Sequence, residues 1–120
     1  MLLQTRPEVL IGKTHRIKTG YGWLYVTINE LDGKPIEVFA TIGKSGASIL
    51  AKAEIIGRFV SLCLRYEVPM KEIIDQLIDI SGSEPIATGD TIIKSIPDAI
   101  GKLLHHLYIK TPPKTEVESL

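Results

Sequence analysis

The sequence has a single cysteine, few aromatic residues and no excess of either charge. Of its 120 residues 6% are aromatic, and 14 lysines and arginines balance 14 aspartates and glutamates. The lone cysteine, Cys63, cannot form an internal disulfide, which argues against a secreted disulfide scaffold. One cysteine and three histidines also cannot supply a standard four-ligand zinc site at recognisable spacing. The balanced charge argues against a dedicated nucleic-acid or anionic-membrane binder, because such proteins carry a basic excess.

Long apolar segments are also missing. No run approaches the ~20 apolar residues of a membrane span, and charged residues interrupt the longest apolar patches every few positions. Residues 1–7 lack the apolar core of roughly 7–15 residues that a signal peptide needs. We therefore expect a cytoplasmic protein that does not contact a membrane.

What is present suits one folded domain. A chain of 13.2 kDa with 44% hydrophobic and 23% charged residues buries roughly two thirds of the surface that its unfolded form exposes. It also contains 18 isoleucines, more than one small core needs. A contiguous exposed surplus of them would indicate a homo-oligomeric or partner interface.

The first third of the chain predicts antiparallel strands. Residues 15–18 form an expected edge strand with positive charge, 23–28 a central strand and 36–42 a returning strand. Asp32 and Gly33 supply the hairpin turn between the last two. The returning strand alternates, and its apolar side consists of Ile36, Val38, Ala40 and Ile42.

The rest of the chain predicts helices. The first has apolar residues three and four positions apart, namely Ile49, Leu50, Ala53, Ile56, Gly57, Val60, Cys63 and Leu64. A second helix covers 70–78, and a short strand is expected at 91–93 after a loop over 81–90. Ser95 is the expected N-cap of a third helix, whose buried stripe is Ile96, Ile100, Leu103, Leu104 and Leu107. Strands followed by helices predict an α+β fold, a small antiparallel sheet with two or three helices packed on one face.

The same patterns suggest three parts. Residues 1–12 resemble an N-terminal arm, 13–108 the α+β domain, and 109–120 a flexible tail rich in proline and polar residues.

The best local candidate for a ligand site is the run Gly43, Lys44, Ser45 and Gly46. It lies at an expected strand-to-helix junction, where free backbone N–H groups and the helix dipole favour an anion such as phosphate. It is not a Walker A loop, because Val38 occupies the position where that motif needs glycine. The alternative is that the two glycines only make the turn.

Other chemistry-bearing residues have structural explanations at least as good as functional ones. His105 and His106 are about 100° apart on a helix and cannot jointly face one metal. Cys63 falls on an apolar stripe, as a buried structural thiol does. Asp75 and Asp79 have the spacing of a carboxylate pair, which is more typical of a solvated helix face. The sequence indicates no catalytic residue and no metal site.

Two aromatic residues at the first turn offer a further surface. Tyr21 and Trp23 flank Gly22 and either anchor the hairpin or stack on a ring. A sheet face that combines Trp23 with Arg16, Lys18 and Tyr25 would suit single-stranded nucleic acid, although the zero net charge disfavours it.

Nearly the whole chain, roughly residues 6–108, also carries the ordered motifs of a known family. The segments are 6–10, 18–22, 24–30, 35–39, 43–46, 53–58, 61–65, 68–69, 72–77 and 95–100. They resemble the TSCPD domain, which lies toward the C-terminus of adenosylcobalamin-dependent ribonucleotide reductases. The Thr-Ser-Cys-Pro-Asp signature that names the domain corresponds here to Ser95, Pro97 and Asp98, with Ile96 at the cysteine position. Because that cysteine is absent, a cysteine-based metal or redox role is not transferred.

The resemblance implies a process rather than an activity. The reductases have a large catalytic barrel with radical and redox cysteines and a cobalamin site, for which this chain has no room. We expect a non-catalytic accessory module of deoxyribonucleotide synthesis that binds no cofactor, adenosylcobalamin belonging to a separate catalytic chain. Its expected partners are the reductase catalytic chain, a nucleotide and further copies of itself. A self-assembling structural module and a single-stranded nucleic-acid binder are the alternatives.

Overall fold

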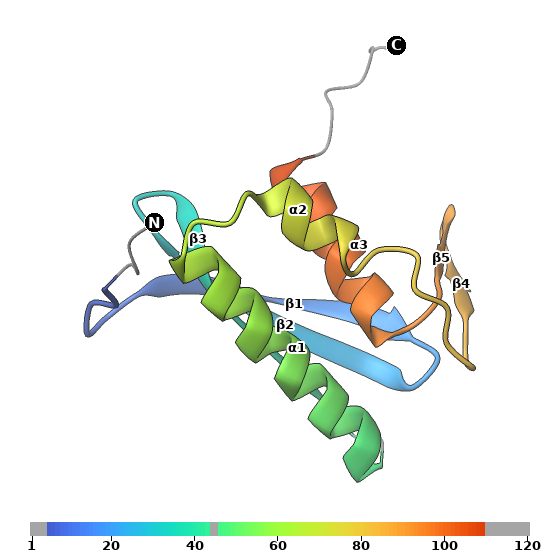
Figure 1. Ribbon diagram of the computed structural model, residues 1–120. Coiled ribbons are helices and arrows are strands. Elements are labelled where there is room, and N and C mark those ends of the chain that lie inside the picture. The colour runs from blue at the N-terminus through green and yellow to red at the C-terminus, as the bar shows by residue number, and fades with distance from the viewer. Residues whose placement is uncertain (1–4, 44–45, 110–120) are drawn as a thin grey trace.

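The computed structural model of the chain describes residues 5–43 and 46–109 (Figure 1). Lys44 and Ser45 of the candidate loop lie outside the described residues, as does the expected tail from residue 110 onward. Within the described residues, no helix is long and apolar enough to cross a membrane.

A three-stranded antiparallel sheet forms the first layer. Its strands are β1 (Ile11–Thr19), β2 (Gly22–Leu31) and β3 (Lys34–Ile42), in the order β1-β2-β3. Asp32 and Gly33 connect β2 to β3 with φ angles of 52° and 80°. Positive φ at both central residues is the condition for the tight type I′ hairpin turn, so the predicted Asp-Gly turn is confirmed.

Helices cover one face of this sheet, and the other face is open. They are α1 (Ala47–Arg65), α2 (Met70–Asp75) and α3 (Ile96–Tyr108), which lie together on the same side in Figure 1. The sheet buries Leu24, Val26, Ile28, Ile36, Val38, Ala40 and Ile42 toward them. The helices contribute Ala53, Val60, Leu64, Ile73, Ile74, Ile96, Ala99, Ile100 and Leu104. The predicted α+β class and the alternation of the returning strand are therefore confirmed.

Helix α1 approaches β3 closely enough to cover its edge. A Cβ atom on Gly57 would lie 3.0 Å from the carbonyl oxygen of Val38. One turn later, Ser61 Oγ accepts a hydrogen bond from the Val38 N–H at 2.8 Å and donates one to the Val38 carbonyl at 2.9 Å. The backbone N–H and carbonyl of Val38, on an edge strand, are thus satisfied by α1. Strand β1, which contains the predicted positive edge segment 15–18, forms the other edge of the sheet.

Two elements differ from the sequence-based prediction. A second hairpin joins β4 (Ile86–Thr88) to β5 (Thr91–Ile93), so the expected loop over 81–90 is wrong for residues 86–88. Three residues are too few to show an alternation, and β4 exists because β5 pairs with it. Helix α2 ends at Asp75 and not at residue 78, since the chain loosens into turns before Asp79, where φ is 63°.

Two leucines assigned to buried stripes are exposed. Leu50 is 41% exposed on the first turns of α1, and Leu107 is 36% exposed near the end of α3. Both lie at the ends of their helices, where the sheet no longer covers every side of the stripe. The predicted periodicity of the helices is confirmed, but a periodicity does not show where along the helix the sheet stops covering it.

Candidate functional site

The face of the sheet opposite the helices carries aromatic, cationic and hydroxyl side chains. We call it the open face and define it by Thr14, Arg16, Lys18, Trp23, Tyr25, Thr27, Phe39 and Thr41. Strand alternation places these residues there because their neighbours point into the core. The three aromatic side chains are between 38% and 55% exposed, which is unusual for groups of this size.

Antiparallel pairing arranges the open face in rows. Lys18 lies opposite Trp23, and Arg16 lies opposite Tyr25, which in turn lies opposite Thr41. The next row consists of Thr14, Thr27 and Phe39, in which the two threonine hydroxyls share a hydrogen bond of 2.7 Å. The four residues that the sequence suggested for a stacking surface, Arg16, Lys18, Trp23 and Tyr25, therefore lie in two adjacent rows.

Two cations lie against the indole of Trp23. The Arg16 guanidinium carbon is 3.9 Å from the ring centroid and Lys18 Nζ is 5.4 Å from it. Both distances are within the range of cation–π attraction. The contact orients the two positive charges beside a flat ring, an arrangement that suits a ligand with both an aromatic ring and an anionic group.

The candidate loop begins at the same end of the sheet. Ile42 pairs with Leu24, so Gly43 follows β3 beside the row that contains Trp23. Gly46 is the N-cap of α1 and supplies no side-chain cap, and the first turn of that helix contains no acidic residue. No carboxylate in the first turn of α1 therefore neutralises the positive end of that helix.

The far end of the open face is closed by an ion pair. The Glu37 carboxylate is buried and accepts hydrogen bonds from Arg6 Nε at 2.5 Å and from Asn29 Nδ2 at 2.9 Å. Burial raises the pKa of this carboxyl, but the hydrogen bonds from Arg6 and Asn29 and the charge of Arg6 outweigh it and hold the pKa below its usual value. Negative charge at this end is thereby neutralised.

The family-signature residues form the N-terminus of α3. Ser95 is the N-cap, as predicted, and its Oγ accepts a hydrogen bond from the Asp98 N–H at 3.2 Å. The same hydroxyl donates to the carbonyl of Ile80 at 2.6 Å. Pro97 occupies the first turn, where its missing N–H and fixed φ are tolerated.

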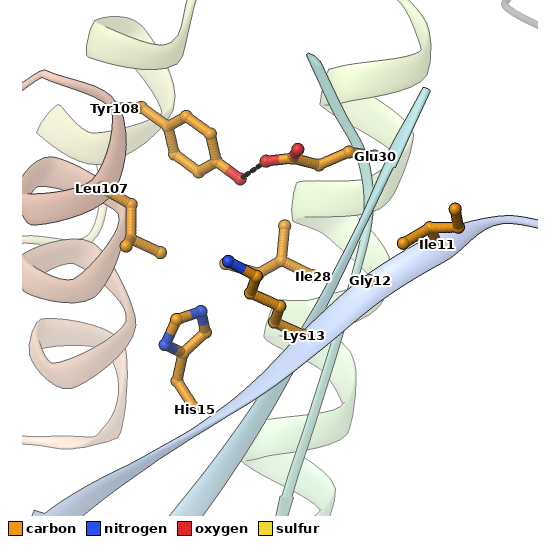
Figure 2. Close-up of a pocket in the computed structure, with 8 residues that line it drawn as sticks. All are labelled: Ile11, Gly12, Lys13, His15, Ile28, Glu30, Leu107 and Tyr108. Atoms are coloured by element: carbon orange, nitrogen blue, oxygen red, sulfur yellow. Dashed lines mark hydrogen bonds between the residues drawn. The ribbon is translucent and has the colours of Figure 1, made fainter. Parts of the chain in front are cut away.

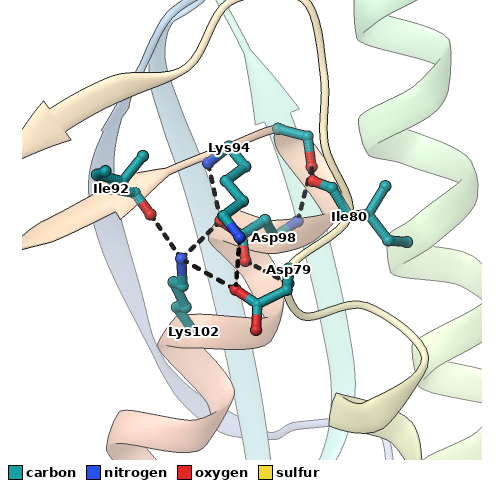
Figure 3. Close-up of polar contacts among 7 residues, drawn as sticks. Asp79, Ile80, Ile92, Lys94, Asp98 and Lys102 are labelled. Carbon is teal, nitrogen blue, oxygen red and sulfur yellow. Dashed lines mark hydrogen bonds and ion pairs between the residues drawn. The ribbon is translucent and has the colours of Figure 1, made fainter.

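Asp98 joins three segments of the chain (Figure 3). Its carboxylate is fully buried and accepts hydrogen bonds from the backbone N–H groups of Asp79 and Lys94 at 2.7 and 2.8 Å. Lys102 Nζ donates to it at 2.8 Å and to the carbonyl of Ile92 at 2.5 Å. Burial raises the pKa of Asp98, but these hydrogen bonds and the Lys102 charge together hold it below its usual value. In this chain, Ser95 and Asp98 of the signature therefore hold the start of α3 against the segments that contain Asp79, Ile80 and Lys94.

A hollow of about 190 Å³ separates the end of α3 from the sheet (Figure 2). Tyr108 donates a hydrogen bond of 2.6 Å to Glu30, and burial together with this carboxylate raises the pKa of the tyrosine. Lys13 and His15 also line the hollow. Because a cation and a carboxylate share so small a space, it has no single charge sign for an ion to recognise. The sequence did not indicate this hollow, since its walls come from opposite ends of the domain.

The remaining candidates are scattered. His105 and His106 are exposed on the last turn of α3. Asp75 is paired with Lys71 at 2.8 Å on α2. Asp79 lies beyond that helix and contacts Lys94 at 3.3 Å, so the expectation of one solvated helix face is wrong for it. Across residues 5–43 and 46–109, no three His, Cys, Asp or Glu side chains are grouped as a metal site would require.

Two more candidates are separated by the fold. Tyr21 and Trp23 do not form one surface, because Tyr21 packs against the core and its hydroxyl is 2.9 Å from Ser83 Oγ. Tyr21 therefore anchors the hairpin, whereas Trp23 belongs to the open face.

Cys63 is half-buried and lines an apolar groove between α1 and α2.

Comparison with known protein families identifies the TSCPD domain. The model of the TSCPD domain matches residues 3–108, which include the open face and the signature at the start of α3. No curated protein and no solved structure matches the chain.

Proposed function

This chain belongs to the TSCPD domain family, and we propose that it acts as a non-catalytic accessory module of ribonucleotide reduction that binds a nucleotide on its open face. The family links the chain to a domain of adenosylcobalamin-dependent ribonucleotide reductases. Nucleotides are the substrates of that process, so a nucleotide is the ligand whose chemistry the family and the open face have in common.

Catalysis is assigned to a separate chain. Cys63, the only cysteine in the sequence, lies among the mainly aliphatic side chains of the α1–α2 groove. One thiol in this setting does not supply the radical and redox cysteines of a reductase, and no base lines the groove to activate it. In this proposal, adenosylcobalamin belongs to that separate catalytic chain.

The observation that carries the proposal is the position of Arg16 and Lys18 against Trp23. A nucleobase stacks on aromatic side chains and on guanidinium planes regardless of its identity. Tyr25, in the adjacent row, extends the surface on which a ring can lie. The two cations then lie at the position of the phosphates, for which charged hydrogen bonds are the usual contacts.

The extent of the open face favours a single nucleotide over a nucleic-acid strand. The cationic side chains occupy two rows at one end, and the other end is occupied by the Arg6–Glu37 ion pair. A strand binder has a positive groove that follows the backbone over several nucleotides. With 14 basic and 14 acidic residues, the chain has no charge excess to attract a polyanion.

Trp23 is the only tryptophan of the chain, so its fluorescence reports on this site alone. We expect titration with ATP, ADP and dATP to quench or shift the emission with a saturable dependence on concentration. Inorganic triphosphate, which has no ring, should change the emission less. An emission spectrum that stays unchanged up to millimolar nucleotide would contradict the proposal.

A ring variant and a matched control test the stacking contact. Trp23→Leu is expected to weaken binding, measured by calorimetry, by about 1–3 kcal/mol, the contribution of one stacked base. Lys71→Gln removes an exposed lysine of α2 and should leave the affinity unchanged. Oligonucleotides provide the competing outcome: an affinity that rises steeply with strand length and falls steeply with salt would favour single-stranded nucleic acid.

The link to a reductase is tested separately. A tagged chain expressed in its source cells should recover a ribonucleotide reductase catalytic chain, and nucleotide should change the amount recovered. Recovery of no reductase, together with no shift of the melting temperature by nucleotides, would overturn the accessory role.

A further inference from the structure

The side of α1 that faces away from the sheet is apolar from Ile55 to the C-cap residue Tyr66. Four large side chains lie there at positions 55, 59, 62 and 66, each between 40% and 61% exposed, namely Ile55, Phe59, Leu62 and Tyr66. We call these four residues the outer stripe. At about 100° per residue, the stripe is centred on the side of the helix opposite the residues that α1 buries.

The outer stripe has the spacing of a coiled-coil seam. Its members are separated by four, three and four residues, which is the a/d pattern of a heptad repeat. A helix packed on one side only needs one apolar face, whereas α1 also buries Ala53, Gly57, Val60 and Leu64 against the sheet. A helix that is apolar on two sides is typical of one buried between two layers.

A hollow lies directly beside the stripe. It has a volume of about 270 Å³ and is lined by Ile55, Ile56, Phe59, Val60, Cys63, Ile73, Gln76 and Leu77. Gln76 is the only polar side chain among these residues. For comparison, an apolar cavity of roughly 150 Å³ holds a benzene ring. Phe59, the most exposed member of the stripe, therefore protrudes next to a hollow large enough for a phenyl ring.

From this geometry we infer that the outer stripe is the interface of a symmetric dimer, in which each Phe59 fills the α1–α2 hollow of a second copy. A two-fold interface uses the same patch on both subunits, so it requires a protrusion and a matching hollow on one surface. Phe59 and the hollow meet that requirement within the same few residues of α1. The same patch therefore offers both halves of a self-complementary contact.

Charges near the stripe permit two copies to meet. Glu54 and Arg58, which border it, form an ion pair of 2.7 Å within the helix. Lys52 precedes the stripe by one turn, and in an antiparallel arrangement the two copies of Lys52 lie at opposite ends of the interface. No unpaired like charges are therefore brought together at the centre.

The exposed area predicts a weak dimer. Because an aromatic side chain offers about 150–250 Å² in all, the stripe leaves on the order of 400 Å² of apolar surface exposed. A standard interface takes roughly 800 Å² from each partner, which the stripe approaches only with the adjoining surface of α2. We therefore expect association at micromolar concentrations.

Sedimentation equilibrium of the full chain from about 5 to 500 µM tests the inference. The wild type should show a monomer–dimer equilibrium, and Phe59→Glu should raise the dissociation constant at least tenfold. Phe39→Glu is the matched control, because Phe39 is a similarly exposed phenylalanine on the open face and its replacement should leave the dimer intact. Leu62→Gln, a milder change within the stripe, gives a second reading if Phe59→Glu has lost its helical circular dichroism.

Several results would overturn the inference. These are a wild type that stays monomeric throughout the range, a dimer that survives both stripe variants, and a dimer lost in Phe39→Glu but not in Phe59→Glu. Release of the dimer by a reductase chain that then occupies the stripe would also overturn it, because the second copy would not be the native occupant. The results at Phe59 and Leu62 do not bear on nucleotide binding, since Trp23 and the stripe lie on opposite layers of the domain. A dimer lost only in Phe39→Glu would instead place self-association on the open face.

Discussion

The two outer surfaces of this domain both expose large apolar side chains, but they differ in chemistry. The open face of the sheet combines aromatic rings with cations and hydroxyl groups, whereas the outer stripe of α1 consists of aliphatic and aromatic side chains bordered by paired charges. Rings beside cations suit a small anionic ligand, and a neutral heptad-spaced stripe suits another helix. The ligand proposed for one layer therefore does not compete for surface with the partner proposed for the other.

The largest expected effect is on the stability of the fold that carries both surfaces, and it comes from a residue that belongs to neither of them. Asp98→Ala is expected to lower the free energy of unfolding by about 3–5 kcal/mol, because it removes a fully buried carboxylate that accepts hydrogen bonds from the Asp79 and Lys94 N–H groups and from Lys102. Chemical denaturation followed by circular dichroism measures the loss. Lys102→Met, which removes the other partner, should also destabilise the fold.

If Asp98 is instead only a surface residue, its alanine variant will unfold at the same denaturant concentration as the wild type. Asp75→Ala provides that reference, since Asp75 is exposed and paired only across a turn of α2. A large loss of stability in Asp75→Ala and none in Asp98→Ala would show that Asp75, and not Asp98, stabilises the fold.

The next largest effect should change nucleotide binding on the open face without changing dimerisation through the outer stripe. Replacing Arg16 and Lys18 together by glutamine is expected to weaken nucleotide binding by about 2–4 kcal/mol, since each charged hydrogen bond contributes roughly 1.5–3 kcal/mol and the two effects overlap. The dimer dissociation constant should not change, because both residues lie on the sheet layer. Calorimetry and sedimentation on the same variant make the comparison direct.

A joint loss of nucleotide binding and dimerisation in that variant would show that the surfaces are coupled or that the variant is misfolded. The melting temperature distinguishes these two explanations. Equal nucleotide affinity in wild type and variant would remove the cations from the site.

A smaller effect should define how far the open face extends. Lys44→Ala is expected to weaken nucleotide binding by about 1–3 kcal/mol, which is the contribution of one hydrogen bond to a charged group. The reason is that the loop begins beside the row that contains Trp23. The fold should stay intact. Affinity for ATP and for the corresponding nucleoside should be measured side by side, because the nucleoside lacks the phosphates and should not respond. An unchanged affinity for ATP would exclude the loop.

The smallest effect is the dependence of stability on pH. The pKa values of Asp98 and Glu37 are lowered in the folded chain, so both carboxyls bind protons more readily when unfolded. Their stabilising contribution is therefore present above about pH 4–5, the range in which unfolded carboxyls titrate, and is lost as the pH falls through the lower folded values. Asp98→Asn should flatten this decline, as measured by denaturation between pH 2 and 6. A wild type equally stable across that range would contradict it.

The sequence predicted the secondary structure and part of the candidate site. The Asp32-Gly33 turn, the Ser95 cap and the alternation of the third strand depend on neighbouring residues, so local patterns were sufficient. The sequence suggested that Arg16, Lys18, Trp23 and Tyr25 share a sheet face, but the pairing of Arg16 with Tyr25 and of Lys18 with Trp23 depends on the register of the sheet. Strand β4 was missed because three residues carry no period of their own.

The sequence also predicted only part of the role of Asp98. Its place at the third position of a helix follows from Ser95, and a carboxylate there suits the helix dipole. Its contacts with Asp79 and Lys102 depend on how the loop after α2 passes the start of α3. A helical carboxylate at this position is usually exposed, and nothing in the local sequence indicated that this one is enclosed.

The order of strands and helices, their caps and their apolar faces follow from interactions between residues close in the chain, and these are encoded locally. Which face of the sheet is left open, which side of α1 lacks a partner, and which hollow lies beside Phe59 depend on contacts between segments far apart in the chain. A helix with two apolar sides does not indicate by its pattern which side the sheet will cover. That choice is made only when the layers pack, because the close approach at Gly57 and the hydrogen bonds of Ser61 to Val38 orient α1 on the sheet.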